Sequence, residues 1–281
     1  MKKSLFAILI MLSLQTNAQR MFVTTFFGAS GYKGDLQPNT LSFLQAKPVG
    51  GLGFDYEITD RIFAKLECNI ARVYGDDKYN PRNRARNLSF QSDIYEISLM
   101  AEYNLFDLYD YDMTPFFFTG IAYFKFSPFV DLPNGARAYL KEYSTEGQGF
   151  YQGRTPYQLA EWSIPYGFGV QWAITKNIRF AAIMGIRKTN TDYLDDVSTT
   201  YVDKNLLLQN RGSSAVDLAY KGDLLPYGTP YPAAGTERGN PNDDDVYYFS
   251  GASFRFRVDA KGRKRRIETG KMRSRVTCPK L

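Results

Sequence analysis

The 281-residue sequence contains no histidine. Histidine is the usual general base near neutral pH, the partner of serine in nucleophilic dyads and a frequent ligand of zinc and haem iron. Its absence argues against most hydrolases and metalloenzymes. The sequence therefore predicts a protein without catalytic residues, bound metal or cofactor, and an enzyme is the third-ranked hypothesis, behind the two given below.

Cysteine is also scarce, since only Cys68 and Cys278 are present. Two cysteines are too few for the disulfide framework of a small secreted protein. Cys68 falls among the apolar positions of a predicted strand, and Cys278 lies close to the C-terminus. We expect two free thiols, with pairing between two molecules through Cys278 as the alternative.

Long apolar runs are absent outside the N-terminus, although a membrane-spanning helix needs ~20 predominantly apolar residues. At the N-terminus, Lys2 and Lys3 precede a short apolar segment at 6–14 and the small-residue cleavage site Thr16-Asn17-Ala18. We predict a signal peptide over residues 1–18, because the segment is too short for an anchor. An exported chain without membrane helices is either a secreted soluble protein or a β-barrel.

Aromatic residues are abundant, at 16% of the chain with 21 Tyr and 21 Phe. In residues 159–174 every second residue is apolar, with Trp162 and Trp172 near the two ends of the row, and the other row is mostly small or polar. Side chains of a strand point alternately to opposite faces. Aromatic residues near both ends of an apolar row are typical of strands that cross a membrane in ~9–11 residues.

Seven further segments have strand patterns, and the connections between the eight alternate between short turns and long loops. The predicted strands are residues 21–32, 49–58, 62–70, 92–105, 116–126, 159–174, 178–189 and 247–258. Outer-membrane barrels have an even number of strands, short periplasmic turns and long external loops. We predict an all-β fold, a single eight-stranded antiparallel transmembrane β-barrel over residues 19–259. Both termini are then periplasmic, and residues 260–281 form a basic periplasmic tail.

Charged residues share one parity of most predicted strands, which we assign to the lumen. The inward set is Glu57, Glu67, Glu96, Glu102 and Glu161 with Lys65, Lys125, Arg179, Arg187, Arg255 and Arg257. We expect these groups to pair and the interior to be filled by side chains, with a narrow pore as the alternative. In the fifth strand we expect Phe116, Phe118, Ala122, Phe124 and Phe126 to face outward and Thr119, Tyr123 and Lys125 to face inward. The parity of the first strand is unclear.

Aspartates gather at both ends of the longest loop, at Asp192, Asp195 and Asp196 and again at 243–245. Their spacing matches no calcium-binding loop pattern. We therefore expect solvated loop charges rather than a metal site.

Positive charge is concentrated at the C-terminus, where residues 261–281 hold nine lysines and arginines and one acid, Glu268. An exported chain is not expected to meet nucleic acid, so we expect outer-membrane lipid headgroups, the cell wall or an acidic protein as partners, or a disordered basic end without a partner. The predicted partner-binding residues are Arg263, Lys264, Arg265, Arg266, Lys271, Arg273 and Arg275.

Several segments resemble the PorG family, outer-membrane barrels of the type IX secretion system of Bacteroidetes. They are YKGDL at 32–36, RNLSF at 86–90, EGQG at 146–149, TDYLDDVS at 191–198, RGN at 238–240 and the Cys-Pro pair at 278–279.

The resemblance implies a non-enzymatic barrel that associates with a periplasmic ring of the PorK lipoprotein and PorN and helps hold that ring at the outer membrane. Most of the resembling segments lie on the predicted external side, whereas the ring is periplasmic. We therefore place the ring contact on the short turns and the basic tail. The runner-up hypothesis is a small barrel that acts in transport or in surface binding through its long loops.

Overall fold

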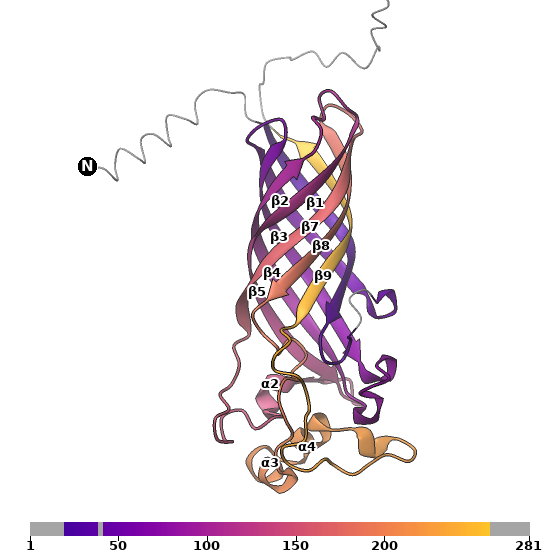
Figure 1. Cartoon of the computed structure of the whole chain (residues 1–281), viewed down its shortest axis with the longest axis vertical. Coiled ribbons are helices and arrows are strands. Elements are labelled where there is room, and N and C mark those ends of the chain that lie inside the picture. The colour runs from indigo at the N-terminus through magenta and orange to yellow at the C-terminus, as the bar shows by residue number, and fades with distance from the viewer. Residues whose placement is uncertain (1–19, 39–41, 259–281) are drawn as a thin grey trace, which may run out of the picture.

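The computed structural model describes residues 20–38 and 42–258, and within them nine strands form one antiparallel sheet. Eight strands close into a barrel, because β4 pairs with β5 as well as with β3 (Figure 1). The strands are β1 Arg20–Lys33, β2 Lys47–Glu57, β3 Ile62–Asp76, β4 Ser89–Asn104, β5 Met113–Asp131, β6 Arg137–Tyr139, β7 Ala160–Ala173, β8 Ile178–Thr189 and β9 Val246–Arg257. The three-residue β6 pairs with β5 alone. The predicted eight-stranded barrel is confirmed.

Each barrel strand pairs with its neighbour along the chain, and β1 pairs with β9 to join the first strand to the last. The connections β2–β3, β4–β5 and β7–β8 are short and lie together at one end, which we call the turn end. The four long loops gather at the opposite end, which we call the cap end (Figure 1). β1 begins and β9 finishes at the turn end, as the even strand number requires.

The outer wall of the barrel is an apolar belt. Along β4 the outward side chains Tyr95, Ile97, Leu99 and Tyr103 are about half exposed, at 47–54%, while the inward Glu96, Ser98, Met100 and Glu102 are at most 4% exposed. The outward row of β7, which includes Trp162, Ile164 and Phe168, is likewise exposed. An outward apolar face on a closed barrel is the surface that faces lipid in an outer-membrane barrel. No helix of the described residues is long and apolar enough to cross a bilayer.

The predicted facing of β5 is wrong. Phe116, Ala122, Phe124 and Phe126 are fully buried and Phe118 is 6% exposed, so these residues point inward, whereas Thr119, Tyr123 and Lys125 point outward and are exposed. The outward row of β5 also contains Phe117 and Ile121. Both faces of this strand are therefore apolar, and the position of a few polar residues could not identify the lumen side. In β1, Phe22, Thr24 and Phe26 face inward.

The strands continue past the belt at the cap end, further than predicted for β3 and β5. β5 has 19 residues, whereas ~9–11 tilted residues cross a bilayer. Beyond the belt the outward residues become charged, and Asp93 pairs with Arg72 at 2.5 Å and with Arg137 at 3.3 Å. These pairs replace lipid contacts where the sheet leaves the membrane.

The long loops fold into a cap that contains short helices (Figure 1). The α-helices are α2 Leu140–Tyr143, α3 Lys204–Arg211 and α4 Ser213–Ala219, and the 3-10 helices are η1 Phe43–Gln45, η2 Asp77–Tyr79, η3 Arg84–Arg86 and η4 Gly222–Leu224. The Asp203 side chain caps α3 by accepting from the N–H groups of Asn205 and Leu206 at 2.9 and 3.0 Å. Val202, Leu207, Ala215, Val216 and Ala219 form a small apolar core between α3 and α4.

Candidate functional site: a sealed lumen and a buried polar cap

The barrel interior is organised around Arg255, which is completely buried. Its guanidinium donates to both Glu102 oxygens at 2.7 and 2.5 Å and lies 3.0 Å from Asp55. Lys65 joins the same cluster at 2.9 Å from Glu67 and 3.4 Å from Glu102. Buried charges need this degree of compensation, because water is excluded from them.

Two further clusters flank this centre. Toward the cap, Arg187 lies 3.2 Å from Glu96, and Tyr247 donates to the same carboxylate at 2.7 Å. Toward the turns, Arg179 lies 3.5 Å from Glu57, which also accepts from Arg20 at 3.0 Å. Most of the predicted lumen pairing is therefore confirmed. Lys125 is the exception because it faces outward, and Glu161 and Arg257 lie half-buried near opposite ends of the inward rows.

Side chains fill the barrel between these clusters. Arg187 lies over the Phe249 ring at 4.0 Å and Arg179 over the Phe22 ring at 4.4 Å, so the cations also pack against the aromatic residues. The cavity lined by Lys65, Glu67, Phe118 and Arg187, among others, holds about 10 Å³, which is no more than one water molecule requires at ~10–15 Å³. The arrangement supports the filled interior and leaves no room for a pore at this level.

Arg238 is the centre of the polar network in the cap. It is 3% exposed, donates to Glu146 at 2.9 Å and to the Asp196 carbonyl at 2.6 Å, and lies 3.8 Å from the Asp196 carboxylate. Glu146 also accepts from the N–H groups of Ser198 and Thr199 at 2.9 and 3.1 Å. One buried arginine and one buried glutamate thus join two long loops, β5–β7 and β8–β9.

Arg86 forms the second centre. Its guanidinium donates to both oxygens of the buried Asp77 at 2.8 Å, and it also donates to the carbonyls of Arg238 and, at 3.3 Å, Asp35. The Asp35 carboxylate accepts from the N–H of Asn240 at 3.0 Å. Bidentate pairing of this kind fixes the arginine plane and therefore the relative position of the loops.

The aspartates at 192, 195, 196 and 245 are buried, so the expectation of solvated charges is wrong for them, although Asp243 and Asp244 are exposed. Tyr32 donates to Asp195, Thr145 and Tyr157 donate to Asp196 at 2.5 and 2.7 Å, and the N–H of Leu194 donates to Asp245 at 2.9 Å. Asp195, Asp196 and Asp245 thus hold the loop in place. No group of three or more acidic, cysteine or histidine side chains among the described residues is arranged to hold a metal ion.

Burial changes the acidity of these carboxyl groups. Desolvation, with the nearby Asp195 carboxylate, raises the pKa of Asp192 to about 9. Desolvation also raises the pKa of Asp196 to about 6, although Arg238 opposes the shift. Burial in the cap thus raises the pKa of both carboxyl groups, that of Asp192 more than that of Asp196.

The five described segments that resemble the PorG family meet in this network. Asp35, Arg86, Glu146, the 191–198 segment and Arg238 come from all four long loops and are joined by the contacts given above. The sequence did not reveal this convergence. One signal was present, because several of the charged residues have an apolar residue close by in the sequence that is buried in the structure. These apolar residues are Leu36, Leu88, Leu194 and Val197. The segments build the cap.

The remaining predictions fall elsewhere. Cys68 is a free, exposed thiol on the outer wall, as expected. The signal peptide, Cys278 and the partner-binding residues Arg263, Lys264, Arg265, Arg266, Lys271, Arg273 and Arg275 lie outside the described residues.

Solved structures with a similar arrangement are outer-membrane proteins. Neisserial surface protein A has a TM-score of 0.42 and 10% identity over 86% of this chain and 100% of its own. Ail of Yersinia pestis has a TM-score of 0.41 and 9% identity over 85% and 98%. E. coli outer membrane protein W has a TM-score of 0.36 and 15% identity over 85% and 100%.

No curated protein matches the sequence. A family match does extend over residues 2–211, which includes the barrel from β1 to β8 and three of the four cap loops in full. The chain belongs to this family, which is described as a domain of unknown function, DUF6089.

Proposed function

We propose that this protein is a non-enzymatic outer-membrane barrel of the type IX secretion machinery that associates with a periplasmic PorK and PorN ring and helps hold it at the membrane. The cap then faces the cell exterior, and the turn end, both termini and the basic tail face the periplasm. The proposal follows the resemblance of the cap segments to the PorG family.

The observation that carries the proposal is the convergence of those segments. They are far apart in sequence, yet Arg86, Glu146 and Arg238 link them into one buried network. A chance resemblance of short loop segments would not be expected to select the residues that hold the loops together. The convergence of the segments in one network therefore supports the proposed common role.

The filled interior supports a structural role over transport. Arg255, Lys65 and Phe116 occupy the lumen at 0–2% exposure. The charged groups there form ion pairs with one another. The described residues that form the site do not include a nucleophile with an adjacent base. A barrel of this kind is suited to anchoring other proteins.

A pull-down from native membranes in mild detergent tests the proposal. The full chain is compared with a chain truncated after Asp259 and with a full-length chain in which the seven predicted tail residues are replaced by glutamine. We expect ring proteins with the full chain and their loss from both variants. Retention by both variants moves the contact to the short turns, and the absence of ring proteins from all three overturns the secretion role.

A second candidate is surface binding through the cap. Leu224, the last residue of η4, is 75% exposed, and Tyr227, three residues further along, is fully exposed. Exposed apolar side chains on an ordered loop are a common feature of binding surfaces. Recovery of an external partner by the full chain, and its loss in Tyr227→Ser with ring proteins retained, would favour this function.

A further inference from the structure

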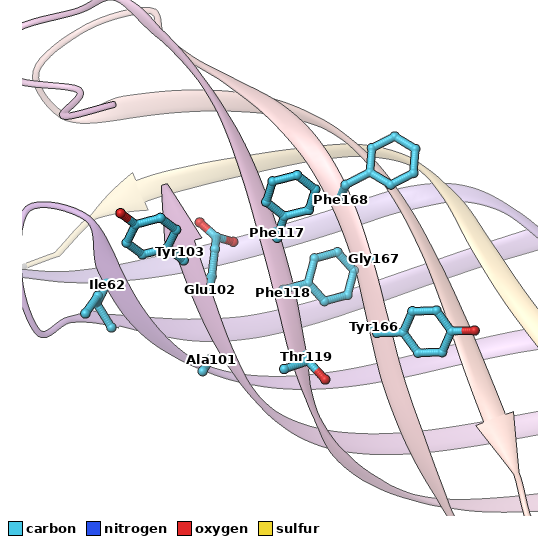
Figure 2. A pocket seen from close by; sticks show the side chains of 10 residues that line it. All are labelled: Ile62, Ala101, Glu102, Tyr103, Phe117, Phe118, Thr119, Tyr166, Gly167 and Phe168. Atoms are coloured by element: carbon cyan, nitrogen blue, oxygen red, sulfur yellow. The ribbon is translucent and has the colours of Figure 1, made fainter. Parts of the chain in front are cut away.

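The apolar belt contains a recess on its outer surface, at the wall formed by β3, β4, β5 and β7. The recess has a volume of about 570 Å³, within the ~300–1,000 Å³ of small-molecule sites. Figure 2 shows that its lining side chains come from these four strands, with Ile62 and Tyr103 on the side nearest the turns. It lies outside the sealed lumen.

The recess exists because small residues adjoin one another in a wall of large ones. Ala101 pairs with Thr119, so two small side chains of the lining lie side by side on β4 and β5. On the turn side, Ile62, Tyr103, Phe117 and Phe168 form a row of paired large residues that are 39–56% exposed. Tyr166, paired with Thr119, borders the recess on β7.

The lining is chemically suited to hydrocarbon. Of its outward side chains, only the hydroxyls of Tyr103, Thr119 and Tyr166 are polar. Glu102 borders the recess from the inward row, but its side chain is buried and engaged with Arg255 and Lys65. The recess therefore offers no charge of its own to a ligand.

The rim at the turn end carries charges of both signs. Arg61 immediately precedes Ile62, is exposed, and accepts the Asn104 N–H at its carbonyl at 2.8 Å, which holds the turn against the end of β4. Asp60 is exposed beside it, and Asp107 lies near enough to interact electrostatically with both residues. A phosphate and an ammonium group together would complement this rim.

We infer that the recess is a binding site for one acyl chain of a zwitterionic phospholipid, such as phosphatidylethanolamine, from the leaflet at the turn end. The chain lies over Ala101 and Thr119 between Phe117, Phe168 and Tyr166. The phosphate lies near Arg61 and the ammonium near Asp60. This site is independent of the secretion role, because it depends only on the outer wall of the barrel.

Native mass spectrometry of the full chain, titrated with phosphatidylethanolamine in detergent, tests the site. We expect one tightly retained lipid, and about tenfold weaker binding in Ala101→Leu, which fills the recess, in line with the ~10–200-fold effect of a methylene in an apolar pocket. Ala182→Leu, on the outward row of β8 away from the recess, is the matched control and should bind like the parent chain. Thr119→Leu fills the recess from β5 and provides a second variant should Ala101→Leu not fold.

Three outcomes would overturn the inference. The first is the absence of a retained lipid in the parent chain. The second is lipid retention by both recess-filling variants that equals that of the parent chain. The third is a dimer that forms in place of the lipid complex. Phosphatidylglycerol and Arg61→Gln test the headgroup contact. We expect each to weaken binding several-fold, because the first lacks the ammonium and the second lacks the guanidinium. Unchanged binding in both would refute the assigned headgroup contact.

Discussion

Arg86 and Arg84 lie two residues apart in the same 3-10 helix but have different environments. Arg86 is 7% exposed and donates to Asp77 through two hydrogen bonds, whereas Arg84 is exposed. Removing one partner of a buried ion pair leaves the other charge uncompensated. Comparing the same substitution at the two arginines therefore separates the effect of breaking a buried ion pair from the effect of losing a positive charge.

We expect Arg86→Met to destabilise the closed cap by about 3–5 kcal/mol and Arg84→Met to have little effect. Hydrogen exchange measures this directly, because the N–H of Leu88 donates to Asp77 at 2.9 Å and should lose its protection. Equal exchange in the two variants would show that the Arg86–Asp77 pair does not hold the cap.

The stability of the cap should fall as pH rises. Burial, with Asp195 nearby, raises the pKa of Asp192 to about 9, whereas an unfolded aspartate titrates near ~3.9. Between these values the folded cap binds a proton that the unfolded chain has released, and stability then decreases with increasing pH. Asp196, with its pKa raised to about 6, contributes in the same direction over the lower part of the range.

We expect faster amide exchange in residues 191–198 as the pH rises from about 6 to 9, after correction for the intrinsic pH dependence of exchange. Asp192→Asn should remove much of this change, because its side chain stays neutral throughout. Asp243→Asn, at an exposed position in the same loop, is the control and should behave like the parent chain. Stability that increases with pH would contradict the protonated state of Asp192.

At the scale of the element, β5 shows where strand periodicity is informative and where it is not. In β3 the charged Lys65 and Glu67 share the inward parity, so the pattern predicts the facing correctly. In β5 large apolar residues occupy both parities, and its lysine lies outside the lumen, at the cap end of the belt. Gly167 and Gly185 make room for the inward ring of Phe118, because a Cβ on either would lie 2.6 Å from Phe118 Cζ.

Phe118→Ala and Phe117→Ala test the facing of β5. Phe118 is 6% exposed and Phe117 is 55% exposed. We expect Phe118→Ala to lower the free energy of unfolding by about 3–5 kcal/mol, because it leaves a cavity in a packed interior. Phe117→Ala should cost less, because lipid can fill the space that it leaves. Urea unfolding in lipid vesicles, followed by electrophoretic mobility, measures both, and a larger loss for Phe117→Ala would reverse the assignment.

At the scale of the whole molecule, the lumen of the barrel is filled by its own side chains. Arg255, Arg187 and Arg179 form three charged clusters along the lumen, and each is at most 4% exposed. We expect no steady conductance from the full chain in planar bilayers. A sample of the same chain that is denatured before reconstitution provides the baseline. Reproducible channel steps above that baseline would contradict the sealed lumen and favour transport.

The sequence by itself determined the barrel. Alternation along strands such as residues 159–174 depends only on the two-residue period of an extended chain in contact with lipid on one side. The alternation of short and long connections determined that the short turns lie at one end of the barrel and the long loops at the other. Charge parity also predicted the pairing of Arg255, Arg187 and Arg179 with lumen acids, because buried charges require partners.

Only the tertiary structure decided the cap and the recess. Asp35, Arg86, Glu146, Asp196 and Arg238 are separated by up to about two hundred positions, and no local period connects them, so their burial follows from how four loops pack. The recess likewise depends on register, because Ala101 and Thr119 are neighbours only across paired strands. Local physics specifies which face of a strand is apolar, and long-range packing specifies which residues meet.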